Sequence, residues 1–468
     1  MKNLAIVTLL VLAMASSVFS QAISGGQARE AAMGGSQAGT GLVLNPFIMN
    51  DPSLMFVNPA YQANYHDYGW SNIAGGNIAG TTNTAQDGYG LQSAGINFSL
   101  NSDWNIGAIL SYDPSAANAV SSLIGFSGIV QRENGAQNIN PIQNAWEVVA
   151  STHMSSMSLG FGLMYGSSNS DATTSNVTPA TSTSTQASAH VWGFRAGIID
   201  DLGNGNAFDA SAALRLDKAT DNVDGTPVAN NQGDYSASAT EFSINARGKF
   251  KVSSKFNFVP LGNFSTVSAT PQEDAPPNGV KATTLSRSVK FTEYGFGVGG
   301  EYRSQGVYIA GGISWVSGQV ELDGSNSAVN NSSETETFKY TALPVVNLGA
   351  EWSFLDWLVG RAGYFRYNGN VNVKSQDASG SSETNNTSGQ FVNGTFVPGV
   401  MSNMVLGNLN PGTWDGIVTL GLGFKFGGWA MDATVSDEAL RRGLGLIGGG
   451  TDNINTFGYI TASYNFSE

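Results

Sequence analysis

Apolar side chains alternate strictly with polar or small ones along many segments of this sequence, from about residue 92 to the C-terminus. In residues 157–165 every second side chain is large and apolar, and Ser158, Gly160 and Gly162 stand between them. The same pattern recurs in residues 104–112, 208–217, 242–250, 294–302 and 418–426. A period of two indicates β-strands. Runs this long exceed the usual five or six residues of soluble strands and match the roughly nine to eleven that a tilted strand needs to cross a bilayer. The pattern predicts an all-β fold, a transmembrane antiparallel β-barrel.

Composition supports this prediction over a large soluble sandwich or jelly roll. Charged residues make up only 12% of the chain, against about 25% in average soluble domains. Aromatic residues make up 10% and glycine contributes 59 residues. Aromatic side chains also stand at the ends of the apolar faces, as girdles at the two membrane interfaces would. They are Trp104, Tyr112, Trp352, Phe354 and Trp429.

Connections between the alternating segments are of two kinds. Seven are short: residues 101–103, 153–155, 201–206, 252–255, 304–306, 354–356 and 427–428. The long ones are rich in Ser, Thr and Asn: residues 167–185, 220–234, 270–283, 323–335 and 371–412. Short turns on one side and long loops on the other are typical of outer-membrane barrels. Seven turns imply fourteen strands, and one more on each flank (about 66–80 and 454–466) gives sixteen, so we expect about 14–16 strands.

The N-terminus predicts export. Residues 1–20 read as a signal peptide, with Lys2, a short apolar core and a small-residue cleavage site before Gln21. With the barrel pattern, this predicts the outer membrane of a Gram-negative bacterium, with outer-membrane lipid around the wall. The last strand ends on Phe466 and resembles the signal read by the barrel insertion machinery. A net charge of −14 without a basic block speaks against nucleic acid as a partner.

Residues 21–65 do not alternate, and we expect a hatch segment there, before a barrel formed by residues 66–468. A short helical patch ends at Gly34 and Gly35, which suit a helix C-terminus. Asp51 and Pro52 suit the start of a second short helix, as N-cap and first residue. Pro52 and Pro59 cannot donate to a strand ladder. This segment is predicted to plug the lumen or to hang below it.

These residues resemble the N-terminal hatch of the FadL/TodX family, outer-membrane transporters of long-chain fatty acids and aromatic hydrocarbons. The resemblance rests on Arg29, Met33, Gly34, Gly35, Asp51, Pro52, Asn58, Pro59 and Ala60. It implies a hatch that closes the barrel and a ligand that leaves sideways through the wall. The family's barrel has fourteen strands, and this chain carries extra residues before Asp51, including residues 44–47. PorV-like barrels of the type IX secretion system are similar here as well.

Charged residues on the polar face of the strands are expected to face the lumen, because Arg or Lys facing lipid at mid-bilayer costs about 2–4 kcal/mol. They are Glu147, Arg195, Asp209, Arg215, Arg247, Lys249, Glu293, Glu301, Glu351, Arg361, Lys425 and Asp432. Both signs occur in similar number, which predicts salt bridges inside the barrel. Arg29 of the hatch is expected to pair with Glu147, Glu301 or Glu351.

No enzyme, metal site or cofactor is expected. The three histidines, His66, His153 and His190, lie on different predicted elements, and the chain has no cysteine. A calcium loop at residues 221–225 would lack alternating ligands and a distal Glu, so a polar turn is expected there.

Three functions remain open. The leading hypothesis is uptake of a hydrophobic small-molecule ligand, of fatty acid or hydrocarbon type, which touches Met33, Leu54, Met55 and Phe56. The second is a PorV-like barrel that binds a secreted protein partner through the apolar residues of the predicted loop 391–409. They are Phe391, Phe396, Val397, Val400, Met401, Met404 and Val405. The third is a general porin, which the hatch disfavours.

Overall fold

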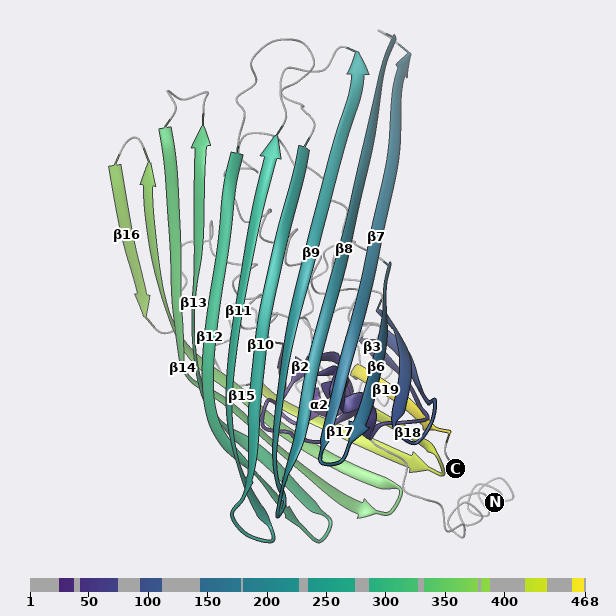
Figure 1. Ribbon diagram of the computed structural model, residues 1–468. Helices are drawn as coiled ribbons and strands as arrows, with labels where there is room; N and C mark the ends of the chain where they lie inside the picture. The colour runs from purple at the N-terminus through teal and green to yellow at the C-terminus, as the bar shows by residue number, and fades with distance from the viewer. Residues whose placement is uncertain are drawn as a thin grey trace, which may run out of the picture.

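The computed structural model is a closed antiparallel β-barrel with a small insert inside it (Figure 1). It describes residues 25–37, 43–74, 93–111, 144–177, 180–226, 235–273, 286–326, 332–377, 380–387, 417–435 and 457–466. The predicted signal peptide, Tyr112 and loop 391–409 lie outside these residues. No helix among the described residues is long and apolar enough to span a membrane.

The wall runs in chain order through the strands β3 to β19, and the last strand pairs with the first. The strands are β3 (Tyr68–Ala74), β4 (Ser93–Ser99), β5 (Trp104–Ser111), β6 (Asn144–Met154), β7 (Met157–Val177), β8 (Ala180–Gly203), β9 (Asn206–Thr226), β10 (Tyr235–Lys251), β11 (Phe256–Glu273), β12 (Ser286–Ser304), β13 (Val307–Asn326), β14 (Ser332–Leu355), β15 (Leu358–Asp377), β16 (Gly380–Thr387), β17 (Ile417–Phe426), β18 (Trp429–Val435) and β19 (Phe457–Asn465).

Two of these strands share one place in the wall. β16 pairs with residues 370–377 of β15, and β17 pairs with residues 358–365 of the same strand. β19 closes the ring against β3, with Ala462 opposite Ser71. The described wall therefore has sixteen positions around the ring, which confirms a barrel within the predicted range of about 14–16 strands.

The seven short turns lie where the sequence places them, all at one end of the barrel, which we call the short-turn end. The predicted long loops are wrong in part. β7 continues to residue 177 and β8 begins at residue 180, so residues 167–185 are largely strand. Five other strands also extend into predicted loops: β9, β11, β13, β14 and β15. These extensions are polar on both faces, so they carry no alternation. Backbone hydrogen bonds between neighbouring strands hold these extensions together without any alternation of side chains.

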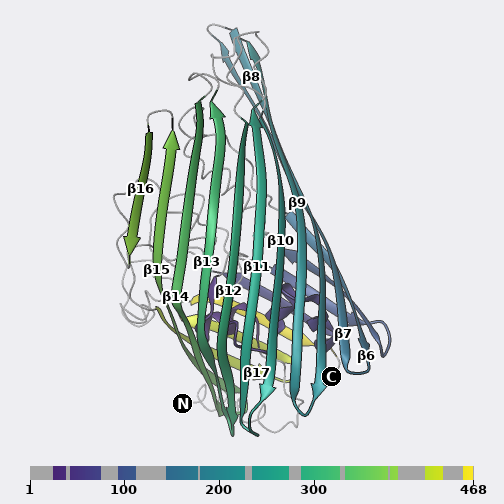
Figure 2. The same cartoon turned by 60° about the vertical axis from the view of Figure 1, so that its left-hand side comes forward.

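The extensions make the described wall uneven (Figure 2). β7 to β15 are 17 to 24 residues long, whereas β3 to β5 and β17 to β19 have 7 to 10. We call the end to which β7 to β15 rise the tall end.

A belt of exposed apolar side chains circles the outside of the wall. On β12 it consists of Tyr294, Phe296, Val298 and Tyr302. Aromatic pairs border it toward the tall end, where Tyr165 lies 4.7 Å from Trp192 between ring centres. At the short-turn end the ring centres of Trp429 and Tyr464 are also 4.7 Å apart. A belt between two aromatic girdles is the outer surface of a barrel that crosses a bilayer.

The insert, which we call the plug, consists of residues 25–37 and 43–67. It contains the helix α2 (Gln27–Ala32), the short strands β1 (Ser36–Gln37) and β2 (Val43–Leu44), and two 3₁₀ helices, η1 (Pro52–Phe56) and η2 (Pro59–Asn64). As predicted, Asp51 caps η1 with Pro52 at its first position. The plug lies in the lumen toward the short-turn end (Figure 1), which decides between the two predicted placements.

The belt generates a stability prediction. Val298, 48% exposed in the middle of the belt, is expected to face the centre of the bilayer. Val298→Arg should lower the free energy of unfolding in lipid by about 2–4 kcal/mol, because it places a charge in hydrocarbon. Ser268→Arg is the matched control, since Ser268 is exposed on the outer face of β11 beyond the belt. Urea unfolding in lipid vesicles measures both, and equal stability of the two variants would contradict the assigned belt.

Candidate functional site

The plug touches the wall on nearly opposite sides. α2 packs against β15, β17, β18 and β19, and η2 packs against β5, β6, β7 and β8. Between them Phe47 is fully buried beside Gly299 and Gly312, where an added Cβ would lie 2.4 and 2.7 Å from its ring. Small inward residues on the wall therefore make room for the plug.

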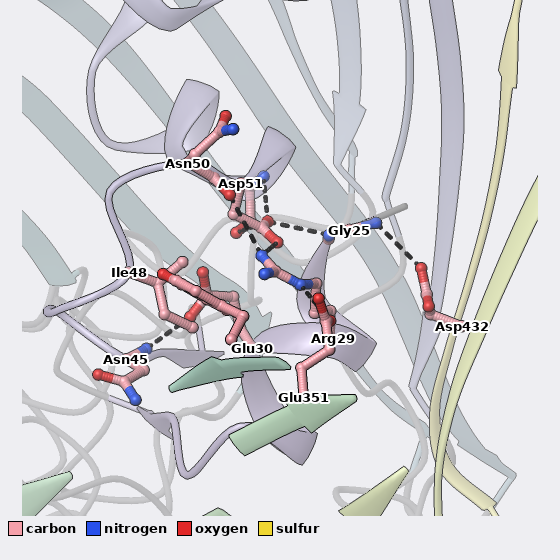
Figure 3. A network of polar contacts seen from close by, with 12 residues as sticks. Gly25, Arg29, Glu30, Asn45, Ile48, Asn50, Asp51, Glu351 and Asp432 are labelled. Atoms are coloured by element: carbon pink, nitrogen blue, oxygen red, sulfur yellow. Dashed lines mark hydrogen bonds and ion pairs between the residues drawn. The ribbon is translucent and has the colours of Figure 1, made fainter. Parts of the chain in front are cut away.

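Asp51 holds the plug together from within. Its carboxylate is fully buried and accepts the N–H groups of Ser53 and Gly26, at 2.8 and 2.9 Å. It also pairs with Arg29 at 2.8 Å. The same side chain thus caps η1, fixes the start of α2 and neutralises Arg29, as Figure 3 shows.

A chain of buried ion pairs joins the plug to the wall. Arg29 Nε lies 2.9 Å from Glu351 on β14. Glu351 also pairs with Arg361 on β15 at 2.7 Å, and Arg361 reaches Asp432 on β18 at 2.5 Å. Asp432 in turn accepts the N–H of Gly25 at 3.0 Å (Figure 3). Of the three carboxylates expected for Arg29, Glu351 is the one it meets.

A second anchor lies on β9 and β10. Asp209 and Arg247 pair at 2.8 Å, and the Tyr61 hydroxyl donates to Asp209 at 2.5 Å. Arg247 also donates to the carbonyl oxygen of Ile48 at 3.0 Å. One wall ion pair therefore holds both a plug side chain and the plug backbone.

A third anchor joins β6 and β8 to the end of η1. Arg195 pairs with Glu147 at 2.6 Å and donates to the carbonyl oxygens of Met55, at 3.1 Å, and Phe56. The carbonyl ends of a short helix carry partial negative charge, which suits a guanidinium.

Asn58 fastens the start of η2. Its side chain accepts the N–H of Ala60 at 3.0 Å. Its Nδ2 donates to the carbonyl oxygens of Ile198 on β8 and Ala210 on β9, at 3.1 and 3.2 Å. A Cβ at Gly197 would lie 1.9 Å from Asn58 Oδ1. The Asn-Pro-Ala motif is therefore a capped helix start pressed against a glycine of the wall.

Among the other expected lumen charges, Glu301 also holds the plug. It accepts the N–H of Met49 and the hydroxyl of Tyr308. Arg215 pairs with Glu241 at 3.3 Å, and Glu293 accepts the Tyr340 hydroxyl at 2.5 Å. Lys249 and Lys425 have no ion pair within the described part of the chain.

Three of the four expected ligand contacts lie inside packed clusters. Met33 packs with Ile48 and Tyr308. Leu54 and Met55 belong to a cluster with Trp70 and other aromatic residues. They are 0 to 2% exposed, whereas Phe56 is half-buried, with its ring at 89° to that of Trp70. A ligand in the lumen can reach only Phe56 among the four without displacing the plug.

Some residues that hold the plug were not predicted from the sequence. Asn45 is fully buried and bonds Glu30, Met33 and Phe47 of the plug. Asn97 on β4 donates to the carbonyl oxygens of Gln62 and Tyr65. Asn97 does alternate with outward apolar residues, so its inward direction was predictable. Its bond to the plug was not, because nothing local indicates it.

Gly34 and Gly35 place the plug backbone directly on the wall. Gly34 has a φ of +73°, and its carbonyl accepts the Asn347 side chain of β14 at 2.8 Å. A Cβ at Gly363 of β15 would lie 2.0 Å from Gly34 N. The plug and β15 therefore meet backbone to backbone.

Solved structures similar to this chain include two of the FadL/TodX type. The toluene transporter TodX of Pseudomonas putida is 11% identical, with 96% of this chain and 100% of that chain covered and a TM-score of 0.37. A FadL homologue of Pseudomonas aeruginosa is 12% identical, with the same coverage and a TM-score of 0.41. The FrpB iron transporter of Neisseria meningitidis is 9% identical over 80% of this chain and 69% of that chain, with a TM-score of 0.35. No family model and no curated protein matches the sequence.

The backbone contact at Gly363 predicts how to loosen the plug. Gly363→Val should weaken docking of the plug by about 1–3 kcal/mol, the usual cost of overpacking. The new side chain would meet the backbone of Gly34, which cannot move aside as a flexible side chain could. We expect faster proteolysis within residues 25–67, while the barrel stays closed and heat-modifiable. Gly262→Val is the control, since its nearest side-chain atom is at 3.5 Å. Unchanged plug proteolysis in Gly363→Val would refute the contact.

Glu30 makes plug docking depend on pH. Burial raises the pKa of Glu30 well above its ordinary value, and the nearby Asp51 carboxylate raises it further. The docked plug therefore favours protonated Glu30, so docking is strongest below the ordinary Glu pKa. It should weaken as pH rises toward the raised value, by at most about 1.4 kcal/mol per pH unit.

Glu30→Gln should remove this slope and slow amide exchange in residues 27–33 at neutral pH, since its amide oxygen can still accept the Asn45 N–H. Hydrogen exchange between pH 5 and 8, corrected for intrinsic rates, measures it. Glu383→Gln, at an exposed pair with Lys374, is the control. An undiminished slope in Glu30→Gln would show that another group is responsible.

Proposed function

We propose that this protein is an outer-membrane transporter that takes up a hydrophobic small molecule through a barrel closed by the plug. The observation that carries the proposal is the way in which the plug is held. It sits across the lumen, yet the ion pairs of the wall that anchor it are complete without it.

Each anchoring charge of the wall has a partner within the wall. Glu147 pairs with Arg195, Asp209 with Arg247, and Glu301 with Arg303 at 3.8 Å, and Glu351 and Asp432 share Arg361. Within the plug, Arg29 pairs with Asp51. Leaving one charge of a buried pair without its partner typically costs about 3–5 kcal/mol. Displacing this plug breaks the Arg29–Glu351 contact and leaves Glu351 and Asp432 to share Arg361, but each anchoring charge keeps a partner of opposite sign, which suits a part that moves.

The lining of the lumen favours a hydrophobic solute. Toward the tall end from the plug, the inward faces of β11 to β15 carry buried apolar side chains. They are Val267, Phe291, Val320, Ala342, Val345 and Phe365. Hydrophobic linings with few polar groups are the usual character of small-molecule sites.

The apolar belt and the predicted signal peptide support a place in the outer membrane of a Gram-negative bacterium. The short-turn end, with the plug, then faces the periplasm, and the tall end faces outward. We expect the barrel insertion machinery to act on β19. A PorV-like role would depend on residues 391–409, which lie outside the described residues, and no described contact favours it.

Deletion of residues 22–60 tests the proposal. The barrel should still fold and remain heat-modifiable, because its ladder and wall ion pairs are complete. It should conduct ions more freely in planar bilayers and lose selective uptake. Asn58→Ala with Pro59→Ala should have a milder effect, since it removes the cap of η2 and its bonds to β8 and β9.

Two results would count against the proposal. Failure of the deleted protein to assemble would make the plug part of the folding nucleus. Unchanged conductance would mean that the plug does not close the lumen.

A further inference from the structure

Asp217 is a buried carboxylate that no group of the described chain satisfies. It lies on β9, on the same inward face as Asp209 and Arg215, and is 6% exposed. Neither carboxylate oxygen has a hydrogen-bond partner. Its cross-strand neighbours are Val191 on β8 and Ala239 on β10, both buried. The carboxylate is therefore set among apolar side chains.

The surroundings of Asp217 form a small apolar patch. Ala189, Val191 and Ala219 pack together, with Met164 of β7 against them. A charge among such side chains is costly unless it is paired or hydrogen-bonded. Elsewhere in the lumen, Asp209, Glu147 and Asp432 each have an Arg partner. Asp217 is buried as they are, but it has no hydrogen-bonded or ion-paired Arg.

The wall around the patch has an excess of negative charge. Arg215 lies two residues before Asp217, directly opposite Glu241 on β10, and pairs with it at 3.3 Å. Glu293 on β12 receives only the neutral Tyr340 hydroxyl. Beyond the Glu147–Arg195 pair toward the tall end, the described inward side chains include the carboxylates of Asp217, Glu241 and Glu293 and one guanidinium, that of Arg215. A negatively charged solute would meet repulsion here.

The patch lies close to the plug. In register, Arg195 is opposite Ala213, and Asp217 is four residues further along β9 toward the tall end. Arg195 contacts the backbone of Phe56. A ligand that reaches from Asp217 past Arg215 toward Phe56 would pass along Val191 and Met164, so its body must be apolar.

We propose that Asp217 and this apolar patch bind an organic cation, an ammonium group carried on an apolar body. The ammonium pairs with Asp217, and the body lies against Val191, Ala189 and Met164. This inference rests on the proposed function, since it names the polar end of the solute that the barrel takes up. It excludes a fatty-acid carboxylate as the preferred solute. A bare metal ion fits poorly, because the described residues hold no cluster of three or more metal-ligating side chains.

Three water-soluble probes of one chain length test the charge preference. Hexylammonium, hexanol and hexanoate are titrated into the full-length protein in nanodiscs by calorimetry, with empty nanodiscs subtracted. We expect hexylammonium to bind about tenfold or more tighter than hexanol, as a charge-assisted hydrogen bond allows, and hexanoate to bind weakest.

Asp217→Asn should lower the affinity for hexylammonium to that for hexanol and leave hexanol binding unchanged. The substitution keeps the shape of the side chain, and heat-modifiability checks that the barrel has folded. Asp171→Asn, at an exposed acid on β7, is the control and should bind as the unaltered protein does. Asp217→Glu should retain the preference for the cation, and so serves as a second test if the Asn variant does not fold.

The outcomes separate this inference from the proposed function. Equal binding of all three probes, or a preference that survives Asp217→Asn, overturns the cation site and leaves a hydrophobic transporter. Binding of none of the probes overturns both.

Discussion

The closed hydrogen-bonded ladder is the constraint on which the rest of this structure depends. In hydrocarbon no water is present to satisfy backbone N–H and C=O groups, so strands can cross only where every edge is paired. β19 meets this need by pairing with β3. Closure also encloses a lumen, and the side chains that cannot face lipid point into it. The ion pairs, the inward glycines and the plug are consequences of that closure.

Charged side chains inside the lumen have different surroundings near the two ends of the barrel. Near the short-turn end, wall charges are paired with one another and also hold plug backbone, as Arg195 and Arg247 do. Toward the tall end the wall carries more apolar side chains beside the Arg215–Glu241 pair, and Asp217 has no hydrogen-bond partner. The same inward alternation thus yields a well-bonded region around the plug and, beyond it, a more apolar region with an unpaired carboxylate.

The membrane-crossing strands were predictable because lipid on one face forces the alternation that the sequence displays. The strand extensions of β7 to β15 were not, since water on both faces allows polar residues at every position. The helix start at Asp51 followed from local capping chemistry. Its bonds to Gly26 and Arg29, and the reach of Arg29 to Glu351, join residues 22 to 322 positions apart. No local pattern reports such contacts, although the parity of Glu351 did place it inside.

The self-paired charges of the wall bear on the order of assembly. If each Arg of the wall needed a plug carboxylate, a barrel that closed early would trap bare charges, and the plug would have to arrive first. Here Arg361 is satisfied by Glu351 and Asp432, and Arg247 by Asp209, whether or not the plug has entered. The chain is therefore free to thread its N-terminal segment into the lumen before, during or after closure of the last strand. No intermediate on these routes leaves one of these anchoring Arg residues without its wall carboxylate, so insertion into the membrane need not wait for the plug.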